Sequence, residues 1–231
     1  MSPSSEGGNG PGPEQGVDWD EVRNAILQKM LEIVPFDGWT VETLRRAATE
    51  AGYDRAAQRQ AFPRGVIDAI SYYSHIADQV MKEQLAETDL AALKVREKVT
   101  LAVRLRIEAL SETKEAARRA AGLLSLPMHA PTGAKLVYRT VDAMWRAIGD
   151  TSTDFNFYTK RTLLAGVYSS TLMHWFSDRS ADSAETWAFL DRRIGDVMTI
   201  EKFKAQARER FKDVPDPFRV LAGFTSGRPR R

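Results

Sequence analysis

The segment from Val141 to Arg161 constrains the fold more than any other part of the chain, because it sets a helix-ending signal directly before a helix-starting one. Gly149 can adopt the left-handed backbone conformation that closes a helix. Thr151, followed three residues later by Asp154, has the form of a capping box, whose side chains satisfy free amides in the first turn of a new helix. We therefore expect two antiparallel helices joined at a short polar hinge.

The helix that follows the hinge carries an apolar stripe with an arginine in the middle. At ~100° per residue, one face of this helix collects large apolar side chains, namely Phe157, Leu164, Tyr168, Leu172 and Trp175. Arg161 falls within the same face, and a guanidinium in apolar surroundings needs an anion or a carbonyl to offset its desolvation. A lipid head group, a carboxylate of a partner or a local aspartate could each fill that role.

Apolar residues recur at helical spacing along most of the chain, and no alternating segment of strand length stands out, which predicts an all-α fold. Four helices are expected first, over residues 22–38, 40–52, 55–62 and 66–85. This order of one helix, two short helices and a long one is typical of a helix-turn-helix module. Further helices are expected over residues 99–110, 116–126, 131–145 and 187–197.

These features divide the chain into a disordered tail over 1–17, a helix-turn-helix-like module over 18–65, a helical core over 66–198 and a basic amphipathic segment over 199–231. The chain has no cysteine, which excludes disulfide frameworks and thiolate metal sites. No run reaches the ~18 apolar residues that a membrane-spanning helix needs. The first thirteen residues have neither the apolar core of a signal peptide nor the arginines of a mitochondrial presequence, so a cytoplasmic location is expected.

The residues offer little to catalysis. His75, His129 and His174 share no metal-ligand spacing, and the chain has no Gly-rich phosphate loop or nucleophile elbow. Asp142, Asp150 and Asp154 stand near the hinge, where capping and pairing with arginines explain them without acid–base chemistry. We therefore expect no enzymatic activity, no metal and no cofactor.

The segment from Thr199 onward combines positive charge with apolar side chains. It holds nine Lys or Arg residues against four Asp or Glu residues. One face of the expected helix is apolar, with basic residues over much of the rest; the apolar face is made by Ile200, Phe203, Ala207 and Phe211. Basic residues attract anionic lipid, and aromatic side chains gain by burial in the membrane interface. Membrane contact is therefore predicted for five side chains, Phe203, Phe211, Phe218, Leu221 and Phe224. The alternatives are a terminal helix that folds back on the core and a disordered end.

Four motifs, in order along the chain, suggest a family. The longest reads Asp-x-Met-Trp-x-x-x-Gly-Asp-x-Ser-Thr-Asp-Phe-Asn-x-Tyr-Thr-x-Arg from Asp142 to Arg161. Around it stand Ile-Val-Pro-x-x-Gly-Trp-Thr over 33–40, Leu-Pro at 126–127 with a proline at 131, and Thr-Trp-x-Phe-Leu-x-x-Arg over 186–193. Over roughly residues 20 to 200 the chain resembles the ninth Coq protein family, lipid-binding accessory proteins of ubiquinone biosynthesis. Phe157 departs from the family, which often has Trp there.

The resemblance implies a TetR-like helical fold, with the helix-turn-helix-like module followed by a helical bundle that binds lipid and forms a homodimer. The resemblance also implies binding of an isoprenoid quinone intermediate or a phospholipid. Because the N-terminal tail is unlike the mitochondrial presequence of familiar members, a bacterial member is expected. Such a protein would present its cargo to a quinone-ring hydroxylase while peripherally associated with the inner membrane. Small residues, Thr162, Gly166 and Ser170, allow close approach of a second helix, although packing within one chain would also explain them.

Two sets of site residues follow. Lipid contact is predicted for the methionine, aromatic and aliphatic side chains around the hinge, which are Met144, Trp145, Phe157, Leu164, Tyr168, Leu172 and Trp175. The alternative is that these side chains simply form the core. Contact with the hydroxylase is predicted for a smaller set at the hinge, Met144, Phe157, Tyr158 and Arg161.

A TetR-type DNA-binding regulator with a hydrophobic ligand is the alternative from a different functional class. The helix over 55–62 offers Arg55, Gln58, Arg59 and Gln60 to phosphates or base edges. It lacks the tyrosine of a TetR-type recognition helix, and two arginines beside Asp54 make a weak electrostatic footprint. We do not expect sequence-specific DNA binding.

Overall fold

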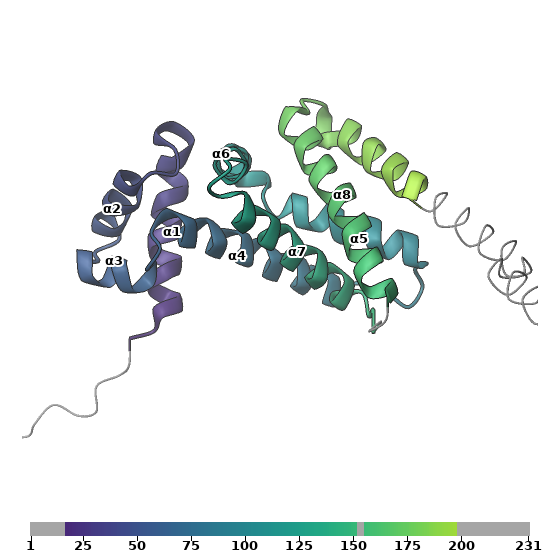
Figure 1. The fold of residues 1–231 in the computed structure, drawn as a ribbon, viewed down its shortest axis with the longest axis horizontal. Coiled ribbons are helices and arrows are strands. Elements are labelled where there is room, and N and C mark those ends of the chain that lie inside the picture. Colours follow the sequence, from purple (N-terminus) through teal and green to yellow (C-terminus); the bar gives the residue numbers. More distant parts are fainter. Residues whose placement is uncertain (1–16, 152–154, 198–231) are drawn as a thin grey trace, which may run out of the picture. The chain divides into compact units, whose positions relative to one another are not determined.

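The computed structural model describes residues 17–151 and 155–197, with the side chains of residues 155 and 156 excepted, and these residues form helices and turns without a strand (Figure 1). The all-α prediction is therefore confirmed for the described part. The helices are α1 (Trp19–Asp37), α2 (Val41–Glu50), α3 (Arg55–Ala61), α4 (Val66–Ala86), α5 (Val95–Glu108), α6 (Lys114–Leu124), α7 (Ala130–Ala147), α8 (Phe155–Ser177) and a last helical stretch over 184–197. Two short 3-10 turns, Ser111–Thr113 and Ala181–Ser183, precede α6 and that last stretch.

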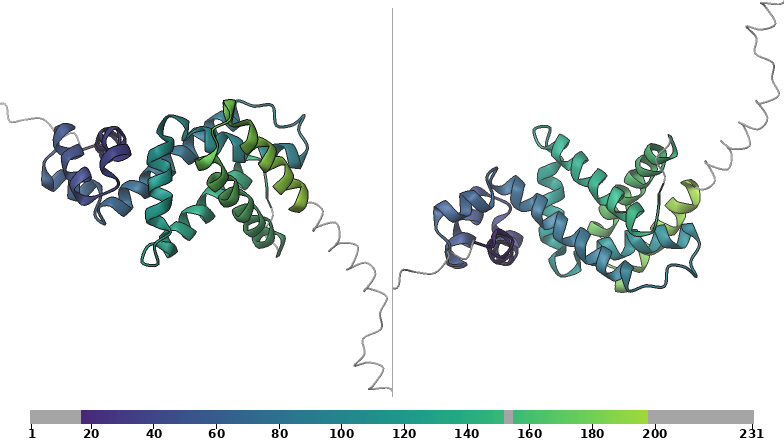
Figure 2. Two further views of the ribbon diagram at one scale, coloured as in Figure 1. Left: turned by 90° about the horizontal axis from the view of Figure 1, so that it is seen from above. Right: turned by 90° about the horizontal axis from the view of Figure 1, so that it is seen from below.

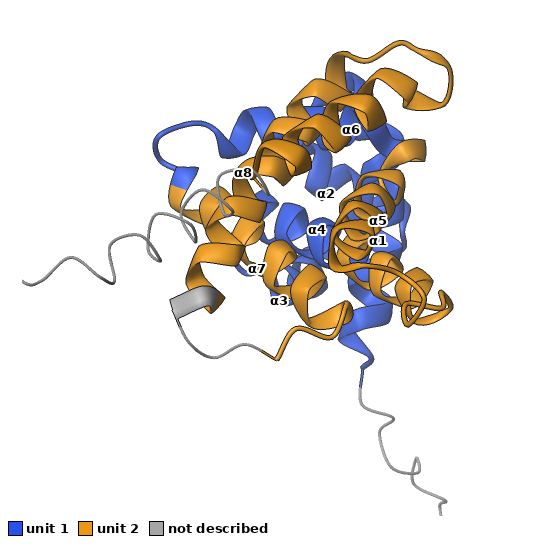
Figure 3. Cartoon of the chain, turned by 90° about the vertical axis from the view of Figure 1, so that its right-hand side faces the viewer, with its two compact units in different colours: residues 1–76, 113–130 blue, residues 77–112, 131–231 orange. Residues whose placement is uncertain are grey.

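The chain divides into two compact units (Figure 3). The first unit takes in residues 1–76 and 113–130, and the second takes in residues 77–112 and 131–231. The chain passes from the first unit to the second within α4. The sequence places a boundary near residue 65 instead, and it does not predict that the segment around α6 belongs with the N-terminal helices.

In the first unit, α2 and α3 lie beside α1 (Figures 1 and 2). Each of these helices begins with a side chain that accepts hydrogen bonds from its free amides: Asp18 for α1, Thr40 for α2 and Asp54 for α3. The expected stripe of α1 is buried, as Val22, Ile26, Met30 and Ile33. These local signals explain why a short stretch of sequence yields a helix-turn-helix-like arrangement.

A buried ion pair joins helices within the second unit. The Arg106 Nε atom of α5 donates to an Asp78 carboxylate oxygen of α4 at 2.6 Å, and the Thr140 hydroxyl of α7 donates to the same oxygen at 2.8 Å. The Tyr168 ring of α8 lies 5.9 Å from the Arg106 guanidinium, and burial raises the pKa of the Tyr168 phenol. Four helices therefore meet at one buried polar group, which fixes their relative positions within the unit.

The turn between α8 and the last helical stretch is fixed by Asp178. Its carboxylate accepts hydrogen bonds from the backbone amides of Ser180, at 2.7 Å, and Thr186, at 2.9 Å. Burial would raise the pKa of Asp178, but hydrogen bonds from these residues lower it well below the usual range. None of the helices in the described part of the chain is long and apolar enough to cross a membrane.

Candidate functional site

At the hinge predicted from the sequence, α7 ends in a Schellman motif. Gly149 adopts a φ of +88°, and its amide donates to the Arg146 carbonyl at 3.0 Å. The Asp150 amide donates to the Trp145 carbonyl at 2.9 Å. The prediction that Gly149 ends this helix is confirmed. The proposed capping box after it needs Asp154, which lies outside the described residues.

Arg161 is buried in α8, with 1% of its surface exposed. Its Nε atom donates to Asp142 Oδ1 at 2.7 Å, and its Nη1 atom donates to Asp150 Oδ2 at 3.3 Å. Nη1 also lies 3.3 Å from the Phe157 carbonyl oxygen, and the guanidinium carbon lies 3.4 Å from the centre of the Phe157 ring. Of the three partners that the sequence leaves open for this guanidinium, the local aspartates are the ones in place.

The same two carboxylates bind two more cations. Asp142 accepts a hydrogen bond from Arg146 Nε at 2.7 Å, and Asp150 accepts one from Lys160 Nζ at 2.9 Å. Burial would raise the pKa of Asp142, but hydrogen bonds from Arg146 and Arg161 lower it. Asp142 therefore stays ionised near neutral pH. The network ties α7, the hinge residue Asp150 and α8 together.

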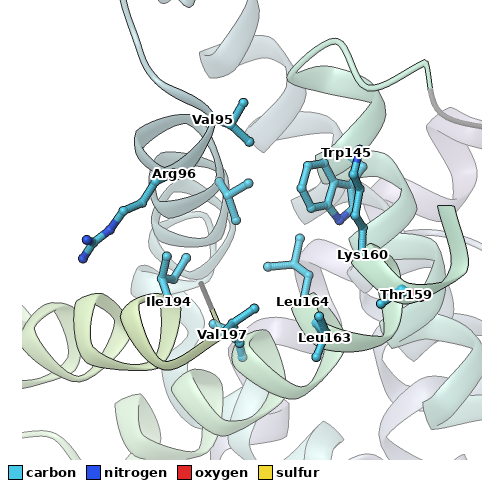
Figure 4. Close-up of a pocket in the computed structure, with 11 residues that line it drawn as sticks. Val95, Arg96, Trp145, Thr159, Lys160, Leu163, Leu164, Ile194 and Val197 are labelled. Carbon is cyan, nitrogen blue, oxygen red and sulfur yellow. The ribbon is translucent and has the colours of Figure 1, made fainter. Parts of the chain in front are cut away.

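A cavity of about 220 Å³ lies in the second unit, next to this hinge (Figure 4). Three helices and the last helical stretch form its wall, through Val95, Arg96, Val99, Trp145, Thr159, Lys160, Leu163, Leu164, Val167, Ile194 and Val197. Most of these side chains are apolar, and none of these eleven carries a carboxylate. In Figure 4 the Val95, Trp145 and Leu164 side chains face a common space, whereas Arg96 points away from it. The geometry suits an apolar ligand.

Comparison with known proteins shows which family carries this arrangement. A family model described as COQ9 matches residues 130–201, which contain α7, the hinge and α8. The mitochondrial ubiquinone biosynthesis protein COQ9 of Rattus norvegicus is 33% identical over 78% of this chain and 60% of its own length. COQ9-B of Xenopus laevis is 31% identical over 81% of this chain and 67% of its own length. The chain belongs to the COQ9 family. It spans about 60% of the length of the first relatives.

A solved structure confirms the TetR-like fold. The TetR transcriptional regulator from Nitrosomonas europaea matches this COQ9-family chain with a TM-score of 0.61, over 76% of this chain and 97% of the regulator. The two sequences are 22% identical, so the likeness concerns the fold alone.

The cavity includes only part of the stripe that the sequence assigns to lipid contact. Trp145 and Leu164 line it. Met144, Tyr168 and Trp175 are buried elsewhere in the unit, and Phe157 and Leu172 are half-buried outside the lining. The structure thus does not bring these five to the cavity.

Besides Leu164, α8 lines the cavity with a neighbouring face, through Thr159, Leu163 and Val167 at i, i+4 and i+8. Sequence reasoning missed these residues, together with Val95, Val99, Ile194 and Val197. The available signal was that α8 is apolar on more than one face, which requires more than one packing partner.

The residues predicted for partner contact separate into exposed and buried ones. Tyr158 is 64% exposed, and its ring packs edge-to-face against the half-buried Phe157 ring, with 5.1 Å between the centroids. Met144 and Arg161 are buried, so neither side chain is presented at the surface in this structure. The residues predicted for membrane contact, Phe203, Phe211, Phe218, Leu221 and Phe224, lie outside the described residues.

Proposed function

We propose that this COQ9-family protein acts in ubiquinone biosynthesis as a lipid-binding accessory protein, without bond chemistry of its own. It binds a polyprenyl quinone intermediate in the cavity of the second unit and presents it to a membrane-associated ring hydroxylase. Similarity to the ubiquinone biosynthesis proteins COQ9 of Rattus norvegicus and Homo sapiens supports a role in ubiquinone biosynthesis. The observation that carries the lipid-binding part is the cavity itself, an apolar space bounded by three helices and a fourth helical stretch.

Physical chemistry favours such an occupant. A polyprenyl chain is nearly insoluble in water, and each Å² of apolar surface that it buries contributes about 25 cal/mol. Ligand pockets commonly measure about 300–1,000 Å³. The present cavity, at about 220 Å³, is smaller and would hold part of such a molecule. The ring or a short section of the tail fits this description.

Filling the cavity tests this function. Leu163 lines the cavity from α8, so Leu163→Trp should exclude ligand. Met128 is exposed before α7 and lies outside the cavity lining and outside α8, so Met128→Trp is the control. In a quinone-producing host whose own COQ9-family gene is replaced by each variant, Leu163→Trp should lower the extracted ubiquinone several-fold and Met128→Trp should not. Equal ubiquinone content in both strains would contradict the proposal.

The proposed partner surface is centred on Tyr158. It is an exposed aromatic side chain at the start of α8, and exposed tyrosines are frequent among residues that dominate binding energy. Arg161 would contribute indirectly, by holding the start of α8 against Asp142 and Asp150. We further propose that the basic segment from Thr199 onward contacts anionic lipid, on the strength of its sequence alone.

We also propose that the protein is a homodimer that uses α8. Thr162 and Gly166 are exposed on this helix, and a Cβ atom added at Gly166 would meet no atom within 4 Å. That leaves room for a second helix to approach closely. A Gly166→Trp variant should run as a monomer in light scattering, and a wild-type protein that is already monomeric would refute the dimer.

DNA binding is the competing function, and the TetR-like fold is the observation that favours it. Arg55 and Arg59 are exposed on α3, but Gln58 is buried and cannot contact a base edge. We expect weak, steeply salt-dependent DNA affinity without sequence preference. Selection of a reproducible palindromic operator from a random DNA library would overturn this and favour a regulator.

A further inference from the structure

The indole N–H of Trp145 is a buried hydrogen-bond donor without an acceptor among the described residues. Trp145 is only 8% exposed. Other tryptophans of the chain satisfy this group: the Trp39 N–H donates to the Ala116 carbonyl at 2.9 Å, and the Trp187 N–H donates to the Asp182 carbonyl at 2.8 Å. A buried donor left without an acceptor is costly, and native proteins rarely keep one without a use.

The position of this donor points to a ligand. Trp145 lines the cavity, and Figure 4 shows the nitrogen-bearing edge of its ring directed toward Leu164, which shares the same wall. A ligand in the cavity would therefore contact the wall in which this N–H donor lacks an acceptor. The apolar remainder of the wall supplies no competing acceptor except the Thr159 hydroxyl.

The polar groups around Trp145 decide what kind of oxygen fits. The Lys160 ammonium lies 5.3 Å from the centre of the Trp145 ring, and it is a donor that Asp150 already neutralises at 2.9 Å. Arg96 points away from the cavity (Figure 4). The wall beside Trp145 therefore favours a neutral acceptor over an anion such as phosphate, because an anion gains most where a cation lacks a counter-ion.

We propose that Trp145 determines ligand specificity by donating its indole N–H to a neutral carbonyl or ether oxygen of the bound molecule. The preferred ligand is an apolar chain joined to an oxygenated ring, and the ring lies at the hinge end of the cavity. This inference rests on the proposed lipid-binding function and adds the chemistry that the cavity recognises.

Two probes of equal chain length test the inference: 2-dodecyl-1,4-benzoquinone, which has acceptor oxygens, and dodecylbenzene, which has none. The dissociation constant of each is measured by displacement of a fluorescent dye from the purified full-length protein. The ratio of the two constants reports the preference for oxygen. In Trp145→Phe this preference should fall by about twofold to tenfold, the worth of one neutral hydrogen bond. In Trp187→Phe, a control whose N–H already has an acceptor, the preference should not change.

A second variant and a spectroscopic measurement keep the test decisive if Trp145→Phe does not fold. Benzothienylalanine at position 145 keeps the shape of tryptophan but lacks the N–H, and it should lose the same preference. In 15N-labelled protein, the Trp145 indole proton should move to lower field when the quinone is added, as a new hydrogen bond requires, and should show no such downfield shift with dodecylbenzene.

An unchanged preference in both variants would overturn the inference while lipid binding stands. Failure of both probes to displace the dye from the wild-type protein would instead overturn the proposed lipid binding, and this inference with it.

Discussion

Replacing Arg161 with methionine should destabilise the second unit strongly. Methionine keeps much of the aliphatic volume and removes the guanidinium. After this change, Lys160 remains as the ion-pair partner of Asp150, whose side chain is 7% exposed, and Arg146 remains as the partner of Asp142. Removing one partner of a buried ion pair costs about 3–5 kcal/mol. Because each carboxylate keeps another cation, we expect a loss at or below the lower end of that range, about 2–3 kcal/mol of the roughly 5–15 kcal/mol that holds a protein folded.

Urea unfolding, followed by tryptophan fluorescence and circular dichroism, measures this loss. Arg146→Met is the matched control, because Arg146 donates to the same Asp142 carboxylate at the same 2.7 Å but is exposed to solvent. The exposed pair should contribute little. A double-mutant cycle with Asp142→Asn then isolates the coupling between Asp142 and Arg161. Equal effects of the two arginine substitutions, or a loss below about 1 kcal/mol for Arg161→Met, would refute the buried ion pair.

Three further outcomes are expected. Burial would raise the pKa of Asp142, but hydrogen bonds from Arg146 and Arg161 lower it below 3.8. The ionised carboxylate therefore stabilises the folded protein above that pH. This stabilisation is lost as the pH falls through the lowered pKa of the folded state. Asp142→Asn should accordingly flatten the acid limb of the stability curve below about pH 4, and an unchanged limb would contradict the lowered pKa. Tyr158→Ala should reduce ubiquinone output without changing the urea midpoint, because the side chain is exposed; a lowered midpoint would make Tyr158 structural. Deleting the chain from Thr199 onward should abolish co-sedimentation with anionic liposomes, and undiminished binding would place the membrane contact elsewhere.

Local signals account for the parts of the fold that the sequence predicts. Helix starts depend on capping side chains such as Thr40 and Asp54, which act within their own first turn. The end of α7 depends on the left-handed conformation of Gly149, which is equally local. Spacing alone also identifies buried faces, as with Val99 and Val103 in α5.

The cavity could not be located in this way, because it depends on contacts between distant segments. Val95 and Ile194 meet at one cavity although they are almost a hundred residues apart, and no local pattern brings them together. The partner of Arg161 was open for the same reason, since a lipid, another protein and Asp142 would all satisfy a guanidinium. In the structure, Asp142 fills this role, with its Oδ1 atom 2.7 Å from Arg161 Nε.

The lipid that leaves a quinone-producing host with the native protein tests the central claim most directly. Native mass spectrometry of the gently purified full-length chain, followed by extraction and fragmentation of the bound molecule, identifies it. We predict a polyprenylated ring compound with at least one neutral acceptor oxygen, in stoichiometric amount. A protein that is free of lipid after mild isolation would contradict the account.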